Sequence, residues 1–161
     1  YFKVAKNTEH PFVVTAGELE VLVTGTTFGV RAYKDEKDIQ TTLESGQVTV
    51  KVEGKSVKLV PNKQVLFNKL TMGMEVRDVD VDLYLAWADG RLVYDNCPLE
   101  KILTDLGRWY NIDVFYSRDE LRSYQFSLNM KKHEEFTQVL ELIGKTGEVQ
   151  FEIKDNTVIV R

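Results

Sequence analysis

The side chains best suited to acid–base, nucleophilic or metal chemistry are few in this sequence, and they lie far apart. His10 and His133 are the two histidines, and neither has a partner at metal-ligand spacing or a serine-nucleophile motif around it. Cys97 is the single cysteine, so an internal disulfide and a thiolate metal cluster are excluded. We interpret Cys97 as a small, half-buried residue before a helix, because no histidine lies near it in sequence to activate the thiol.

Two further patterns resemble chemical sites without having their full set of residues. Asp78, Asp80 and Asp82 alternate with apolar residues, and three carboxylates on one side of a strand could approach Ca²⁺. The segment lacks the glycine turn and clustered oxygen ligands of a calcium loop, so we interpret it as a solvent-facing strand or linker. The stretch 25–29 (GTTFG) has neither the lysine nor the following helix of a phosphate loop. The sequence therefore predicts a protein that is not an enzyme and needs no metal or cofactor.

Charge and hydropathy narrow the class of partner. The 161 residues carry a formal net charge of −4, whereas nucleic-acid binders normally present a basic patch or stripe. We therefore expect no nucleic-acid partner. No apolar run approaches the ~20 residues that a membrane-spanning helix needs, and no signal peptide is recognisable.

Short β-strands are predicted throughout residues 1–82. The central stretch, 21–33, alternates apolar and polar residues on both sides of Gly25, which indicates two strands that meet at a bend. A strand pair is predicted over 41–52, turning at Ser45-Gly46, and a hairpin over 51–59, turning at Glu53-Gly54. Repeated short strands and turns indicate an all-β sandwich or roll.

Residues 83–161 change to helical periodicity and contain an internal repeat. Pro98 suits the first turn of a helix, Asn111 is a plausible stop, and a second helix is expected over 134–144. A shift of 37 positions, from Leu99 to Phe136, superimposes two apolar patterns: Leu99, Ile102, Leu103 and Leu106 on Phe136, Val139, Leu140 and Ile143. We predict a C-terminal α+β domain of two strand–helix–strand repeats.

Several blocks, in order along nearly the whole chain, resemble the extracytoplasmic region of the FecR family of anti-sigma factors. They are Val21-x-Val23-x-Gly25-Thr26-x-Phe28-x-Val30, Thr42-Leu43-Glu44-Ser45-Gly46-Gln47-Val48, Leu59-x-Pro61-Asn62-x-Gln64, Ala86-Trp87-x-Asp89-Gly90-x-Leu92-x-Tyr94, Pro98-Leu99-x-x-Ile102-Leu103 and Leu106-x-x-Trp109-Tyr110. The second half resembles the secretin/TonB short N-terminal domain.

The resemblance implies a cell-surface signalling regulator of Gram-negative bacteria. Such a protein has a cytoplasmic sigma-binding segment and one inner-membrane helix, and this chain resembles the periplasmic region that follows them. The implied partners are the signalling domain of a TonB-dependent outer-membrane transporter, an ECF sigma factor bound by a cytoplasmic segment absent from this chain, and site proteases.

Strand addition is the partner-binding mode that we hypothesise, because it needs only an unpaired strand edge. The candidate edges are 125–130 and 156–161, flanked by tyrosines; the alternative is that both strands are internally paired and the tyrosines cover the core. The candidate partner-binding residues are Tyr116, Tyr124, Gln125, Ser127, Asn129, Thr157 and Ile159.

Two other functions are compatible with the sequence. The chain could be a non-catalytic glycan- or small-molecule-binding envelope module that uses Trp87, Tyr33 or Tyr84 as stacking platforms. It could also be a structural or self-assembling envelope protein.

Overall fold

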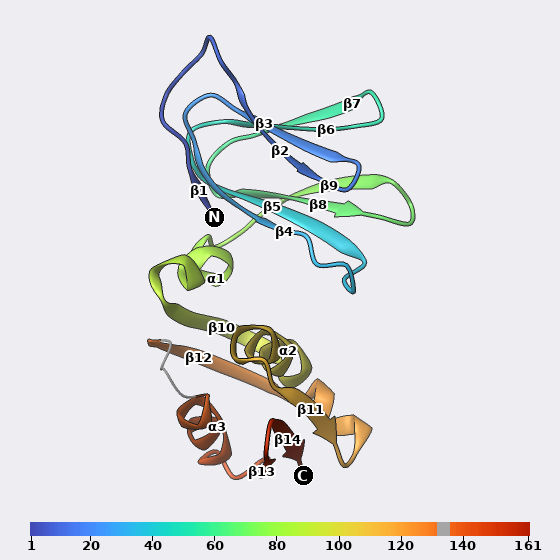
Figure 1. Ribbon diagram of the computed structural model, residues 1–161, viewed down its shortest axis with the longest axis vertical. Helices are drawn as coiled ribbons and strands as arrows, with labels where there is room; N and C mark the ends of the chain where they lie inside the picture. The colour runs from blue at the N-terminus through green and yellow to red at the C-terminus, as the bar shows by residue number, and fades with distance from the viewer. Residues whose placement is uncertain (132–135) are drawn as a thin grey trace. The chain divides into compact units, whose positions relative to one another are not determined.

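The computed structural model describes residues 1–131 and 136–161, and the chain separates into two compact units (Figure 1). The first unit spans Tyr1–Asp89 and the second Gly90–Arg161. The sequence placed this boundary earlier, between residues 82 and 83. The residues in between belong to the first unit because Leu85 is buried and packs against its sheet.

Two antiparallel sheets form the first unit. One has the order β1-β4-β5-β8-β9, with β1 (Phe2–Lys3), β4 (Thr27–Arg31), β5 (Asp38–Ser45), β8 (Lys63–Asn68) and β9 (Gly73–Asp78). The other has the order β2-β3-β6-β7, with β2 (Phe12–Ala16), β3 (Leu19–Val23), β6 (Val48–Val52) and β7 (Lys55–Leu59). Both sheets contribute to one core of Leu19, Val21, Val23, Phe28, Ile39, Leu43, Val48, Val50, Val52, Leu59, Val65 and Phe67. The all-β prediction for this half is confirmed.

The chain passes between the two sheets at Gly25 and again at Gly46. The bend predicted at Gly25 is confirmed, because β3 and β4 lie in different sheets. The hairpin predicted at Ser45-Gly46 is wrong: β5 pairs with β4 and β8, whereas β6 pairs with β3 and β7. The hairpin at Glu53-Gly54 is confirmed, with both residues at positive φ (44° and 78°).

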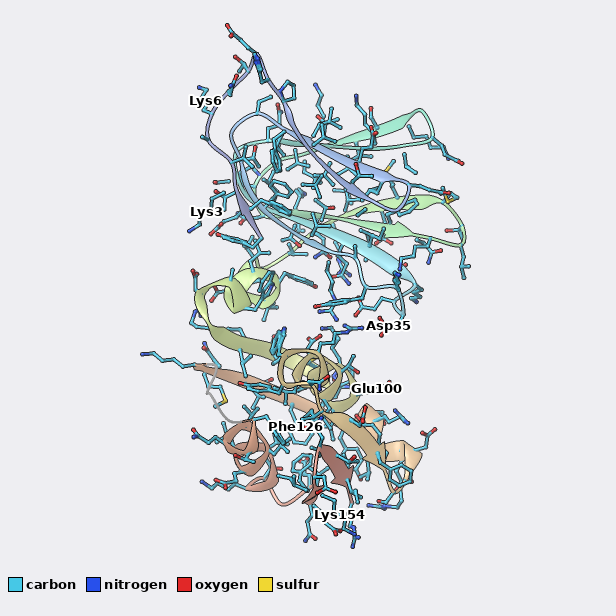
Figure 2. The ribbon with its side chains drawn as sticks, in the orientation of Figure 1. Lys3, Lys6, Asp35, Glu100, Phe126 and Lys154 are labelled. Carbon is cyan, nitrogen blue, oxygen red and sulfur yellow. The ribbon has the colours of Figure 1, made fainter. Side chains whose placement is uncertain are left out.

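Gly25 and Gly46 are required because three backbone segments meet at these crossings. A Cβ on Gly46 would lie 2.6 Å from the Gly25 carbonyl oxygen, and one on Gly25 would lie 2.7 Å from the Cα of Lys6. Figure 2 labels Lys6 on the segment between β1 and β2. Thr26 ties the segments together: it exchanges two backbone hydrogen bonds with Val4 (2.9 and 3.1 Å), and its Oγ1 donates to the Gln47 carbonyl oxygen (2.8 Å).

In its described residues, the second unit contains two sheets and two main helices. β10 (Arg91–Pro98) pairs with β12 (Gln125–Lys131), and β14 (Thr157–Val160) lies between β11 (Asp113–Tyr116) and β13 (Phe151–Lys154). The helices are α2 (Leu99–Tyr110) and α3 (Thr137–Gly144), with a 3₁₀ turn, η2 (Asp119–Ser123). Before this unit lie α1 (Asp82–Leu85) and η1 (Ala86–Asp89).

The α+β prediction for the second half is confirmed. The order strand–helix–strand occurs twice, as β10–α2–β11 and β12–α3–β13. The predicted apolar faces of the helices are buried in one core: Ile102, Leu103 and Leu106 from α2, and Val139, Leu140 and Ile143 from α3. The predicted helix start at Glu134 lies outside the described residues. None of the described helices is long and apolar enough to cross a bilayer.

We predict that Gly46→Ala destabilises the first unit more than Gly54→Ala does. Both glycines have positive φ (89° and 78°), but a Cβ on Gly54 has no atom within 4 Å, whereas one on Gly46 overlaps the Gly25 backbone. Gly54→Ala should lower the free energy of unfolding by about 1 kcal/mol, and Gly46→Ala by about 2–4 kcal/mol. Denaturant unfolding measures both, and equal losses would contradict the close approach.

A second prediction concerns neighbouring threonines on β5. Thr41 is fully buried, and its Oγ1 is the one buried side-chain polar atom without a hydrogen-bond partner among the described residues. Thr42, equally inaccessible, accepts a hydrogen bond from Gln64 Nε2 (2.7 Å). We expect Thr41→Val to raise the free energy of unfolding by about 1 kcal/mol and Thr42→Val to lower it by about 1–2 kcal/mol. Thermal unfolding of both variants is the measurement, and a loss at Thr41 would refute the assignment.

Candidate functional site

In the second unit, β12 is a seven-residue strand with a free edge. In the part of the chain that the structure describes, β12 pairs with β10 alone. Its side chains alternate: Phe126 is buried in the core, whereas Gln125 and Asn129 are exposed. An unpaired edge of this kind presents a row of main-chain N–H and C=O groups to another strand. Among the described residues, the segment 125–130 therefore lies at a sheet edge, and its role in partner binding stays a prediction.

β14, the other predicted edge, is not an edge. It pairs in parallel with β11 and antiparallel with β13, so Thr157 lies between Asp113 and Lys154 and Ile159 between Phe115 and Glu152. The prediction for 156–161 is therefore wrong. A C-terminal strand is easily taken for an edge, because the sequence does not reveal a parallel partner that precedes it in the chain.

Ser127 has a structural role that the sequence did not indicate. Its Oγ accepts a hydrogen bond from the Asn96 backbone N–H (2.9 Å) and donates one to Asp95 Oδ1 (3.2 Å). These partners lie where the pairing of β10 with β12 shifts register, between Tyr94 and Cys97. Ser127 therefore braces a bulge in β10, and its hydroxyl is already engaged within the unit.

The two predicted tyrosines brace the turn before β12. The Arg122 guanidinium lies 4.2 Å from the centroid of the Tyr116 ring and forms ion pairs with Asp119 (2.7 Å) and Glu100 (2.9 Å). Burial raises the pKa of Tyr116 to about 12. Tyr124 is half-buried against the core, and its carbonyl oxygen accepts the Leu99 N–H (2.7 Å). Both residues hold η2 and α2 beside the start of β12.

The carboxylates considered for calcium are engaged in ordinary surface interactions. Asp78 forms an ion pair with Lys63 (2.7 Å), and Asp80 Oδ1 accepts the Asp82 backbone N–H (3.1 Å). Across residues 1–131 and 136–161, no three His, Cys, Asp or Glu side chains are grouped to hold a metal ion. The backbone N–H of His10 donates to Asn7 Oδ1, whereas His133 lies outside the described residues. Cys97 is half-buried, as predicted.

The three aromatic residues considered as stacking platforms contact other side chains. The guanidinium of Arg31 lies 5.0 Å from the Tyr33 ring centroid, and that of Arg77 lies 5.7 Å from the Tyr84 centroid. Trp87 donates its Nε1–H to the Tyr84 carbonyl oxygen (2.8 Å). The faces of Tyr33 and Tyr84 that lie against a guanidinium are not open to a sugar, so these two rings give no support to a glycan platform.

Comparisons with known proteins identify the family. The family model described as FecR protein matches residues 1–57, and the model described as FecR, C-terminal, matches residues 91–160. Two crystal structures of a candidate anti-sigma factor from Parabacteroides distasonis have a similar fold. One has a TM-score of 0.82 at 21% identity and covers 99% of this chain and 74% of that chain; the other has 0.81 at 21%, covering 98% and 74%. No curated protein matches. Because the two family models fall one on each unit, the chain belongs to the FecR family of anti-sigma factors.

Proposed function

We propose that this chain is the periplasmic signal-receiving region of a membrane-anchored anti-sigma regulator. Its second unit binds the signalling domain of a TonB-dependent outer-membrane transporter, and this binding controls an ECF sigma factor through a cytoplasmic segment outside this chain. Family membership supports the regulatory role. The observation that carries the proposed mode of binding is the free edge of β12.

Binding by strand addition fits β12 better than the other free edges of the second unit. β12 has seven residues without a proline or a bulge residue at positive φ. β10, by contrast, is interrupted by Asn96 at φ 43° and ends at Pro98, and both features protect an edge. β11 and β13 have four residues each, and short edges are poor templates for another strand.

An added strand would extend the β10–β12 sheet and bond to main-chain groups rather than to particular side chains. Side chains on the two faces of β12 would then set the preference for one transporter over another. The half-buried Leu128 and Met130 lie on one face, and the exposed Gln125 and Asn129 on the other. Site proteases that act on the full-length protein would follow this binding step.

The proposal predicts that a proline in β12 weakens partner binding. Asn129→Pro removes one main-chain donor and places a ring at the strand. Loss of this donor, together with the clash of the ring with an incoming strand, should weaken binding about tenfold or more. The measurement is calorimetric titration of candidate transporter signalling domains against the 161-residue chain.

The matched control is Lys58→Pro, on the exposed edge strand β7 of the first unit, which should change affinity less than about twofold. Circular dichroism and thermal unfolding verify that each variant folds. Should Asn129→Pro fail to fold, Asn129→Lys replaces it, because it keeps the N–H and adds a charge beside an incoming strand. A folded β12 variant that binds like the control would refute strand addition at β12.

A further inference from the structure

Residues 79–89 are the last segment of the first unit, and we call them the connector. The connector packs on the outer face of the five-stranded sheet. Leu85 of α1 is 7% exposed and fills a notch above Gly29 of β4. A Cβ on Gly29 would overlap Leu85 Cδ2, so the glycine makes room for the leucine. The neighbouring Ala86 is also buried. The connector is therefore a packed element of the first unit.

A chain of polar contacts holds the connector on the same sheet. Gln64 is fully buried, and its Oε1 accepts hydrogen bonds from Arg77 Nε (2.9 Å) and Nη2 (2.5 Å). Arg77 Nη2 also donates to the Tyr84 hydroxyl (3.2 Å), and its guanidinium lies over the Tyr84 ring. Buried polar groups must keep their partners, so these contacts favour one position of α1.

The connector also contacts Tyr1, the residue before β1, which is the shortest strand of the unit. Tyr1, just before β1, packs edge-on against Trp87 with ring centroids 6.4 Å apart, and its hydroxyl donates to Glu44 Oε2 (2.5 Å). β1 pairs with β4 through only two residues, and the stacking of Phe2 on Phe28 (5.1 Å) adds the main apolar contact. Backbone hydrogen bonds between Val4 and Thr26 also hold this segment, and the contact of Tyr1 with Trp87 joins it to the connector.

We propose that β1 and the connector form one latch, in which Trp87 holds Tyr1 only while the connector stays docked on the sheet. Release of the connector loosens β1, and release of β1 loosens the connector to the same degree, because coupling between two sites is reciprocal. The connector leads directly into β10, the partner of β12. The signalling role of the latch rests on the proposed function. In that case, binding at β12 would change how firmly β1 is held on its sheet. The coupling itself does not depend on that function.

The test is amide hydrogen exchange of the 161-residue chain, read residue by residue. Trp87→Ala removes the contact with Tyr1 at a side chain that is 44% exposed, so the unit should remain folded. We expect exchange of the Val4 amide, which bonds to the Thr26 carbonyl oxygen (2.9 Å), to rise about fivefold. The amides of Val21 and Val50, within the opposite sheet, should keep their rates.

The reciprocal variant is Phe2→Ala, which weakens β1 and should speed exchange of the Leu85 amide, bonded to the Val81 carbonyl oxygen (2.9 Å). Leu70→Ala is the control for both, because Leu70 is 87% exposed at the β8–β9 turn and should change neither amide. An unchanged Val4 rate in Trp87→Ala would overturn the latch. So would a uniform rise that includes Val21 and Val50, because it would indicate global destabilisation.

These outcomes are distinguishable from failure of the proposed function. The exchange experiment uses no partner, so a latch that behaves as expected stands even if no transporter domain binds β12. Conversely, a chain that binds through β12 but shows no coupling between β1 and the connector loses the latch alone.

Discussion

The close approach of Gly25 and Gly46 is the constraint on which the first unit depends. Where the chain passes between the sheets, these glycines let two backbone segments approach more closely than a side chain would permit. The backbone of Lys6 packs against Gly25 at the same place. β4 begins two residues after Gly25 and contains Gly29, against which Leu85 of the connector packs.

The second unit differs, because its sheets are small and half of its buried core residues, among those described, come from α2 and α3. Leu103 and Leu106 of α2 pack with Val139 and Leu140 of α3 in one buried cluster. Small sheets leave many free edges, and evolution protects most of them by shortness, bulges or proline. β12 lacks these protections. A fold held together by its helices can keep one strand edge available for a partner.

Local signals in the sequence predicted much of this structure. The Glu53-Gly54 turn and the end of α2 at Asn111 depend on residues that favour a left-handed conformation, so a short window of sequence contains the information. The buried faces of α2 and α3 followed from helical periodicity.

Features that depend on distant partners were not predictable in this way. Gly46 resembles a hairpin glycine, but it serves a contact with Gly25 that only the paired sheets create. Ser127 braces a bulge 31 positions away, and the central place of β14 requires its parallel neighbour β11. The reason for a glycine at position 29 becomes visible only when Leu85, which is distant in sequence, packs against it.

The most direct measurement of the central claim is residue-resolved hydrogen exchange of the wild-type chain, free and saturated with a transporter signalling domain. Strand addition predicts new protection of alternate amides within 125–131, on the side of β12 that does not face β10, with little change in β14. Protection confined to the outer face around Phe115 and Ile159, or none along β12, would contradict it.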